Sequence, residues 1–178
     1  MGTNTQTSST TGTGFDIGVR KTWILPAIVA AIAAAIVAAL GATMTDLGPW
    51  YQGLQKPSWT PPDVVSPVGW TIIFALNTAA IVSAWRAAPT PRESDKIIGL
   101  FSVNAILNIG WSVLFFRMER PDWAFVEVLF LIASIVSLIV YCGRYSKNAA
   151  LLFTPYLIWV SLAAVLNWAI VDLNGPFG

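Results

Sequence analysis

Five apolar runs, each about 20 residues long, constrain what this chain can fold into. An α-helix needs roughly 20 apolar residues to cross the hydrocarbon core of a bilayer. The runs show no apolar–polar alternation, and open strand edges are not tolerated in hydrocarbon, so the runs predict helices. Only 11% of the residues are charged, whereas soluble domains carry about 25%. The sequence therefore predicts an all-α membrane protein, a five-transmembrane-helix bundle with helices at about residues 22–44, 68–85, 97–116, 123–142 and 149–171.

The segments outside the runs suggest one domain with two tails. Residues 1–20 are rich in Thr, Ser and Gly and lack apolar periodicity, which predicts a disordered N-terminal tail. We expect residues 21–172 to form the transmembrane domain and residues 173–178 a short C-terminal tail. Basic residues before the first run would also fit a signal peptide, but that run is too long, so we expect a retained anchor. Seven of the ten Lys and Arg residues lie on the N-terminal side of the predicted bundle, which predicts a cytoplasmic N-terminus.

Composition excludes several kinds of chemistry. The sequence contains no His, which removes imidazole general bases and the usual zinc and haem-iron ligands. Cys142 is the single cysteine, so no intrachain disulfide can form. The net charge of +1 gives no support for nucleic-acid binding. We therefore expect no nucleic-acid partner, no metal site, no required cofactor and no catalytic residues.

The connection between the first two runs, residues 45–67, is long and rich in Trp, Tyr and Pro. Loops of this length in compact proteins are usually functional or disordered. Proline fixes its own φ and restricts the residue before it, so the loop should be stiff and ordered. We expect it to cover one end of the bundle, with Trp50, Tyr51 and Trp59 filling the mouth. The alternative is an interfacial belt, where Trp and Tyr collect in any membrane protein.

Three of the runs carry polar amides beside aromatic rings. Helical spacing places the following on one face of each helix: Trp70, Phe74 and Asn77; Asn104, Asn108, Trp111 and Phe115; Trp159, Ala163 and Asn167. An amide in hydrocarbon needs a partner, so these faces should turn inward. Taken singly, each Asn is better explained as an interhelical hydrogen bond, of about 1 kcal/mol. Taken as a set, the three faces favour a cavity for a large flat ligand.

Glu127 is the one carboxylate well inside an apolar run. Acidic residues within membranes are functional candidates by default, and Glu127 could couple proton movement to export. It also lies about one turn from the expected helix start, where it could reach water or Arg120. We favour the second interpretation.

Four motifs resemble those of the translocator protein family (TspO/MBR), also called tryptophan-rich sensory protein or peripheral-type benzodiazepine receptor. They are "PWYQGLQKPSWTPP", "SPVGWTIIF", "LNIGWSVLFF" and "PYLIWVSLAAVLN". The resemblance runs in order from about Trp23 to Asn167. It implies a five-helix transmembrane bundle, a first loop that closes over a ligand cavity, and a homodimer. Members of the family bind porphyrins, and many bind cholesterol or synthetic ligands.

Where the motifs match, the family's ligand-pocket positions in the loop and in the helices can be assigned to residues of this chain. Together with the amide faces, it gives these ligand-binding candidates: Trp50, Trp59, Pro61, Pro62, Trp70, Phe74, Asn77, Asn104, Asn108, Trp111, Phe115, Trp159, Ala163 and Asn167. The family usually has Tyr at the position of Phe74 and Gln at that of Asn104. Near the end of the fifth run stand Trp168 and Asp172 with no basic residue, so sterol recognition through the motif proposed there is not expected.

The resulting hypothesis is a membrane protein that binds porphyrin-type tetrapyrroles, with porphyrin or haem as ligand, in sensing or transport. One alternative is light- or oxygen-dependent porphyrin breakdown with Trp59 or Trp159 as a redox partner. Another is a proton-coupled exporter that depends on Glu127.

Overall fold

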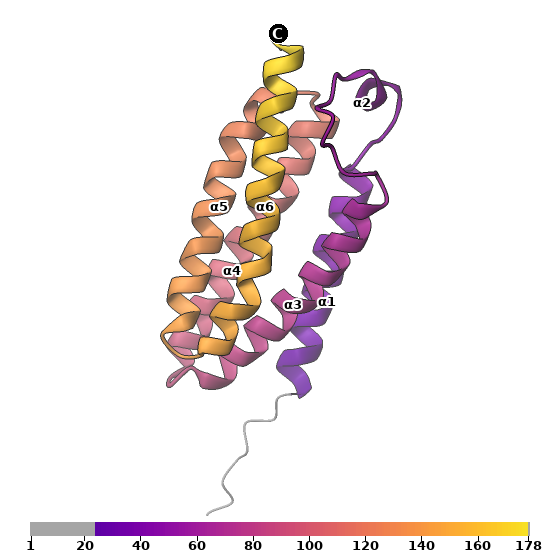
Figure 1. Cartoon of the computed structure of the whole chain (residues 1–178). Helices are drawn as coiled ribbons and strands as arrows, with labels where there is room; N and C mark the ends of the chain where they lie inside the picture. Colours follow the sequence, from indigo (N-terminus) through magenta and orange to yellow (C-terminus); the bar gives the residue numbers. More distant parts are fainter. Residues whose placement is uncertain (1–23, 178) are drawn as a thin grey trace, which may run out of the picture.

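The computed structural model describes residues 24–177, with side chains from residue 28 onward, and is helical nearly throughout (Figure 1). The predicted N-terminal tail, together with Arg20 and Lys21, lies outside the described residues. The elements are α1 Ile24–Met44, α2 Pro49–Gly53, α3 Val65–Ala87, α4 Pro91–Ser112, the π-helical segment η1 Val113–Arg117, α5 Pro121–Gly143 and α6 Lys147–Asn174. No strand occurs in this part of the chain.

Residues 24–177 form six α-helices where the sequence predicts five. The additional helix is α2, a single turn inside the long loop, and it begins at Pro49, whose fixed φ suits the first helical position. Four helices are long and apolar enough to cross a membrane: α3, α4 continued by η1, α5 and α6. In α1 the stretch with described side chains, Ile28–Met44, forms a shorter apolar helix.

The helices α3 to α6 extend beyond their predicted ends, and at the starts of α4 and α6 a capping side chain, and not an apolar residue, sets the boundary. Thr90 caps α4 by accepting a hydrogen bond from the Glu93 backbone N–H at 3.3 Å. Ser146 caps α6 in the same way, from the Ala149 N–H at 3.2 Å. The helix α6 also continues to Asn174, past its expected end near residue 171.

The bundle is tightly packed at the end that carries the α4 N-terminus. The side chains of Ala80, Ala84, Ile97, Leu138 and Phe153 are buried together there, from α3, α4, α5 and α6. The helix α5 packs most extensively on α6 and then on α4, while α1 lies along α3 and α4. Figure 1 shows α3 running away from α6 toward the opposite end, where α2 lies.

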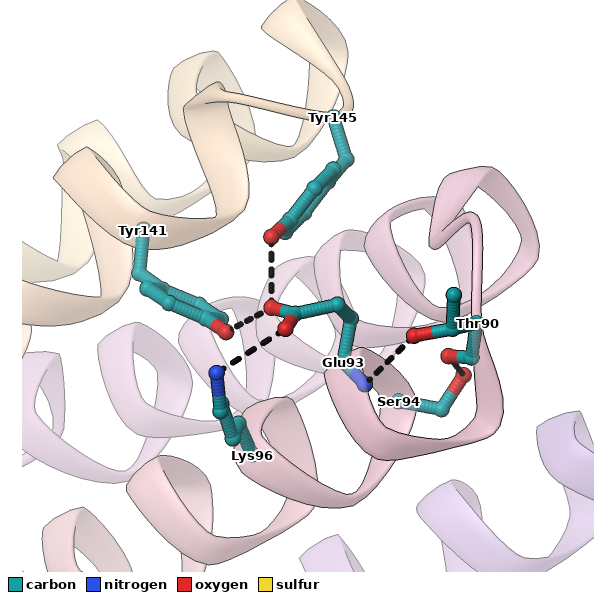
Figure 2. Close-up of polar contacts among 6 residues, drawn as sticks. All are labelled: Thr90, Glu93, Ser94, Lys96, Tyr141 and Tyr145. Atoms are coloured by element: carbon teal, nitrogen blue, oxygen red, sulfur yellow. Dashed lines mark hydrogen bonds and ion pairs between the residues drawn. The ribbon is translucent and has the colours of Figure 1, made fainter.

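Hydrogen bonds to Glu93 connect the helices at this packed end (Figure 2). The Glu93 carboxylate accepts hydrogen bonds from the Tyr145 hydroxyl at 2.6 Å, from the Lys96 ammonium at 2.9 Å and from the Tyr141 hydroxyl. They join the first turn of α4 to the end of α5 and its connection to α6. The bond to Glu93 also raises the pKa of Tyr145 above the ordinary tyrosine value, because it favours the protonated hydroxyl.

The opposite end of α4 widens into the π-helical segment η1. Directly after it, the Met118 N–H donates to the Val113 carbonyl and the Arg120 N–H donates to the Leu114 carbonyl, both at 2.9 Å. Short π-helical turns within α-helices are rare and are frequent at functional sites. The segment turns Phe115 inward, where it is 2% exposed.

Candidate aromatic site at the α2 end of the bundle

Three predicted aromatic residues from α3 and α6 form one cluster. The Trp70 ring stacks on Phe74 with centroids 5.6 Å apart and meets Trp159 edge-on at 6.4 Å. Trp159 also lies against the backbone of α3. A Cβ placed on Gly69 would be 2.6 Å from its ring, so only glycine allows this approach. All three rings are partly exposed, which leaves aromatic surface accessible.

A second cluster joins the long loop to η1. Trp111 stacks on Phe115 with centroids 5.1 Å apart, and Trp50 meets Phe115 edge-on at 6.0 Å. Beside them Tyr51 packs on Phe116 at 5.6 Å. Trp50 and Tyr51 therefore pack on the end of the bundle as the sequence predicts.

Trp59 lies outside both clusters, contrary to the expectation that it fills the mouth. A tight turn, in which the Thr60 N–H donates to the Pro57 carbonyl at 3.0 Å, places Trp59 at an outer corner. Its side chain is 53% exposed. Pro61 and Pro62 are exposed as well, and every residue from 61 to 68 shares this exposure.

Two of the predicted amides meet in a network that the sequence did not indicate. The Asn104 amide donates to the Ser134 hydroxyl at 2.8 Å. Tyr156 of α6 accepts from the Asn108 amide at 3.1 Å and donates to the Asn104 carbonyl oxygen at 3.3 Å. Tyr156 is 2% exposed. It precedes Trp159 by three residues, so the helical spacing that selected Trp159 could also have selected Tyr156.

Asn167 links three elements. Its oxygen accepts from the Trp111 indole N–H at 3.0 Å, and its amide donates to the Pro121 carbonyl at 2.8 Å. Asn104, Asn108 and Asn167 thus form interhelical hydrogen bonds, the interpretation favoured for each Asn taken singly. Asn77 differs: it is 2% exposed, and its side-chain oxygen has no hydrogen-bond partner in the described structure. Ala163, which lies on α6 between Tyr156 and Asn167, is half-buried.

The loop is attached to α6 by a reciprocal pair of hydrogen bonds. The Gln55 backbone N–H donates to the Asn174 side-chain oxygen at 2.7 Å, and the Asn174 amide donates to the Gln55 carbonyl at 2.8 Å. The sequence placed Asn174 in the C-terminal tail. Nothing in its local pattern indicates a partner 119 residues away.

Comparison with known proteins decides the family. The sequence profile of the TspO/MBR family matches residues 27–173. The tryptophan-rich protein TspO of Chlorobaculum tepidum is 39% identical over 125 residues, covering 70% of this chain and 79% of that protein. Protein CrtK of Rhodobacter capsulatus is 32% identical, with 71% and 79% covered, and the human translocator protein is 32% identical, with 68% and 72% covered.

The chain belongs to the TspO/MBR family. With its long apolar helices, this membership establishes a multi-pass integral membrane protein. The matched range contains every candidate residue named above, from Trp50 to Asn167.

The surroundings of Glu127 in this TspO/MBR protein differ from those expected. Arg120 pairs with Asp122, Nε to Oδ1 at 2.8 Å, and that hydrogen bond raises the pKa of Arg120. Both carboxylate oxygens of Glu127 are covered and have no hydrogen-bond partner among the described residues. The favoured interpretation, in which Glu127 reaches water or Arg120, is therefore wrong.

Proposed function

We propose that this protein binds porphyrin-type tetrapyrroles and related hydrophobic ligands at the α2 end of its bundle, in sensing or transport. The observation that carries the proposal is the partly exposed cluster of Trp70, Phe74 and Trp159 where α3 diverges from α6. A porphyrin is a large flat apolar ring, and aromatic side chains stabilise such ligands by offset stacking and edge contacts. At the packed opposite end, the ring of Phe153 is buried in the core, and Tyr141 and Tyr145 are hydrogen-bonded to Glu93.

The amides have separate roles in this proposal. Asn104, Asn108 and Asn167 hold the walls in place, since a ligand that bonded to them would have to replace existing bonds of about 1 kcal/mol each. Asn77 has an unused acceptor and would accept a hydrogen bond from a pyrrole N–H. Lys56, whose ammonium lies 3.9 Å from the centre of the Tyr51 ring, would meet a propionate.

We expect metal-free porphyrin, or haem held without a strong axial ligand. The chain has no His, and Cys142 is buried at the packed end of the bundle, far along α5 from the aromatic cluster. A spectral titration should therefore yield no low-spin, bis-ligated haem.

We further propose that α1 is a fifth span and that the protein forms a homodimer. At 1.5 Å per residue, the 21 residues of α1 extend about 31 Å, close to the thickness of the hydrocarbon core. With five spans, the two ends of the chain would lie on opposite sides of the membrane. The distribution of Lys and Arg then favours a cytoplasmic N-terminus, with α2 and the C-terminus on the other side.

A protoporphyrin titration in lipid nanodiscs tests the binding site. We expect Trp159→Leu and Trp70→Leu each to weaken binding up to about tenfold, the loss of one ring contact. Trp168→Leu is the matched control, because Trp168 lies on the same helix, packs on Phe125 and is 54% exposed. Equal affinity in the wild type and all three variants would show that protoporphyrin does not bind at this aromatic cluster.

The same samples under illumination separate binding from breakdown. If the protein only binds porphyrin, the extracted pigment fades no faster than porphyrin illuminated with empty nanodiscs. Enzymatic breakdown would instead bleach the main absorption band and would depend on Trp159 or on the exposed Trp59.

A further inference from the structure

Glu127 of α5 lies beside residues that support the aromatic cluster. A Cβ on Gly110 would be 3.9 Å from Oε1 of Glu127, which places the carboxyl group against the backbone of α4. The group also interacts electrostatically with the hydroxyl of Tyr156 on α6. Both of its oxygens are covered and have no hydrogen-bond partner among the described residues. The carboxyl group therefore faces α4 and α6 and is closed to solvent.

Among the described residues, the helices packed against α5 bring no positive charge to Glu127. The charged residues of α3 and α4 all lie at the packed end of the bundle. Those of α6 are Lys147, at the packed end, and Asp172, near the other end of the helix. Tyr156 is the titratable group of α6 that faces Glu127.

The two arginines nearest in sequence are engaged elsewhere. Arg117 of η1 donates to the Thr43 carbonyl. Arg120 is hydrogen-bonded to Asp122, Nε to Oδ1 at 2.8 Å. A charge that is buried without a donor or a counter-ion is costly, so the folded protein holds Glu127 as the neutral acid.

Tyr156 connects Glu127 to the aromatic cluster. Its hydroxyl donates to the Asn104 oxygen at 3.3 Å, and its ring meets Trp70 edge-on with centroids 6.2 Å apart. An ionised Glu127 would need a hydrogen-bond donor, and a carboxylate is a stronger acceptor than the amide oxygen of Asn104. It would therefore draw the Tyr156 hydroxyl away from Asn104 and shift the ring that packs on Trp70.

We propose that Glu127 is a positioning residue for the aromatic site. As the neutral acid it leaves the bond between Tyr156 and Asn104 intact, and loss of its proton to water breaks that bond and displaces Trp70. Where ligand affinity is concerned, this inference rests on the proposed porphyrin function. The spectra of the ligand-free protein test it separately.

The test records near-ultraviolet circular dichroism and tryptophan fluorescence of the full chain in phosphatidylcholine nanodiscs, without ligand, from pH 6 to pH 9. Exposed carboxyl groups are already ionised over this range, and tyrosines are still protonated. We expect the wild-type spectra to change with pH. Those of Glu127→Gln, which stays neutral, should keep the wild-type form of pH 6 throughout. Glu119→Gln, in the exposed connection before α5, is the control and should change as the wild type does.

Protoporphyrin affinity extends the test to the binding site. The wild type and Glu127→Gln should bind equally at pH 6, and the wild type should bind severalfold more weakly than Glu127→Gln at pH 9. Comparing the two proteins at the same pH cancels the titration of the ligand's own propionates. If circular dichroism and elution volume show that Glu127→Gln is misfolded, Glu127→Leu takes its place, because it also removes the charge.

Two results would overturn the role of Glu127: wild-type spectra that stay constant from pH 6 to pH 9, or an equal change in the wild type and in Glu127→Gln. Failure of the porphyrin site gives a different pattern. In that case Trp70→Leu and Trp159→Leu leave protoporphyrin affinity unchanged, while the ligand-free spectra still depend on Glu127.

Discussion

At the scale of single residues, Gly69 sets the position of the Trp159 ring. A Cβ on Gly69 would come within 2.6 Å of that ring, a distance that real Cβ atoms do not adopt. The indole therefore has to leave its contact with α3 if residue 69 gains a side chain. Trp159 also contacts Trp70, so displacement of the Trp159 ring would shift the other rings of the aromatic cluster.

We expect Gly69→Ala to weaken protoporphyrin binding severalfold and to change the near-ultraviolet circular dichroism of the tryptophans. Overpacking of this kind costs about 1–3 kcal/mol. Gly99→Ala on α4 is the control, because nothing lies within 4 Å of a Cβ there, and it should leave binding unchanged. Unchanged spectra and affinity in Gly69→Ala would show that the ring contact does not shape the site.

At the scale of elements, the sequence predicted the helices from their apolar content but not the irregular pieces between them. The runs of about 20 apolar residues suffice for α3 to α6 because hydrocarbon leaves no other spanning structure. The turn α2 contains only five residues, and its position depends on tertiary contacts of Trp50 and Tyr51. The π-helical register of η1 likewise has no periodic signature in the sequence.

The candidate site was predictable to a similar degree. Spacing on one helix face found Trp70, Phe74, Trp111 and Asn167, which the structure brings into clusters and hydrogen bonds. It could not reveal that most of the amides are already paired, because their partners include a serine hydroxyl and a backbone carbonyl on other helices.

Attachment of the long loop gives a prediction at this scale. Asn174→Ala removes both hydrogen bonds to the Gln55 backbone, and we expect faster amide hydrogen exchange across residues 49–60. Limited proteolysis in this segment should also accelerate. Asp172→Ala, an exposed change two residues earlier on the same helix, serves as control. Exchange rates identical to the wild type would mean that Trp50 and Tyr51 alone hold the loop.

At the scale of the whole molecule, the two ends of the bundle differ in how they are held. The end with Glu93 combines a buried core of small and branched side chains with a polar cluster that ties α4 to the α5–α6 connection (Figure 2). At the end with α2, the beginning of α3 is exposed and aromatic contacts predominate.

The hydrogen bond between Tyr145 and Glu93 at the packed end predicts that the thermal stability of the protein depends on pH. The pKa of Tyr145 is raised by its bond to Glu93, so the stability that the bond contributes is fully present below the ordinary tyrosine pKa of about 10. That contribution is lost as the pH rises toward the raised value, because the unfolded chain loses the proton first. We expect Tyr145→Phe to melt below the wild type at pH 8, and the difference to shrink at pH 11. A difference that grows with pH would contradict this assignment.

The attachment of the loop through Asn174 has a consequence for how members of this fold can diversify. The partner of Asn174 is the main chain of Gln55, and Arg117 likewise donates to the Thr43 carbonyl in the last turn of α1, just before the loop. Bonds to peptide groups do not depend on which amino acid occupies the position. Apart from Trp50 and Tyr51, which pack on Phe115 and Phe116, the side chains between these two anchor points can therefore be exchanged while the loop stays attached. The loop can thus vary in sequence and alter ligand preference while the helices stay unchanged.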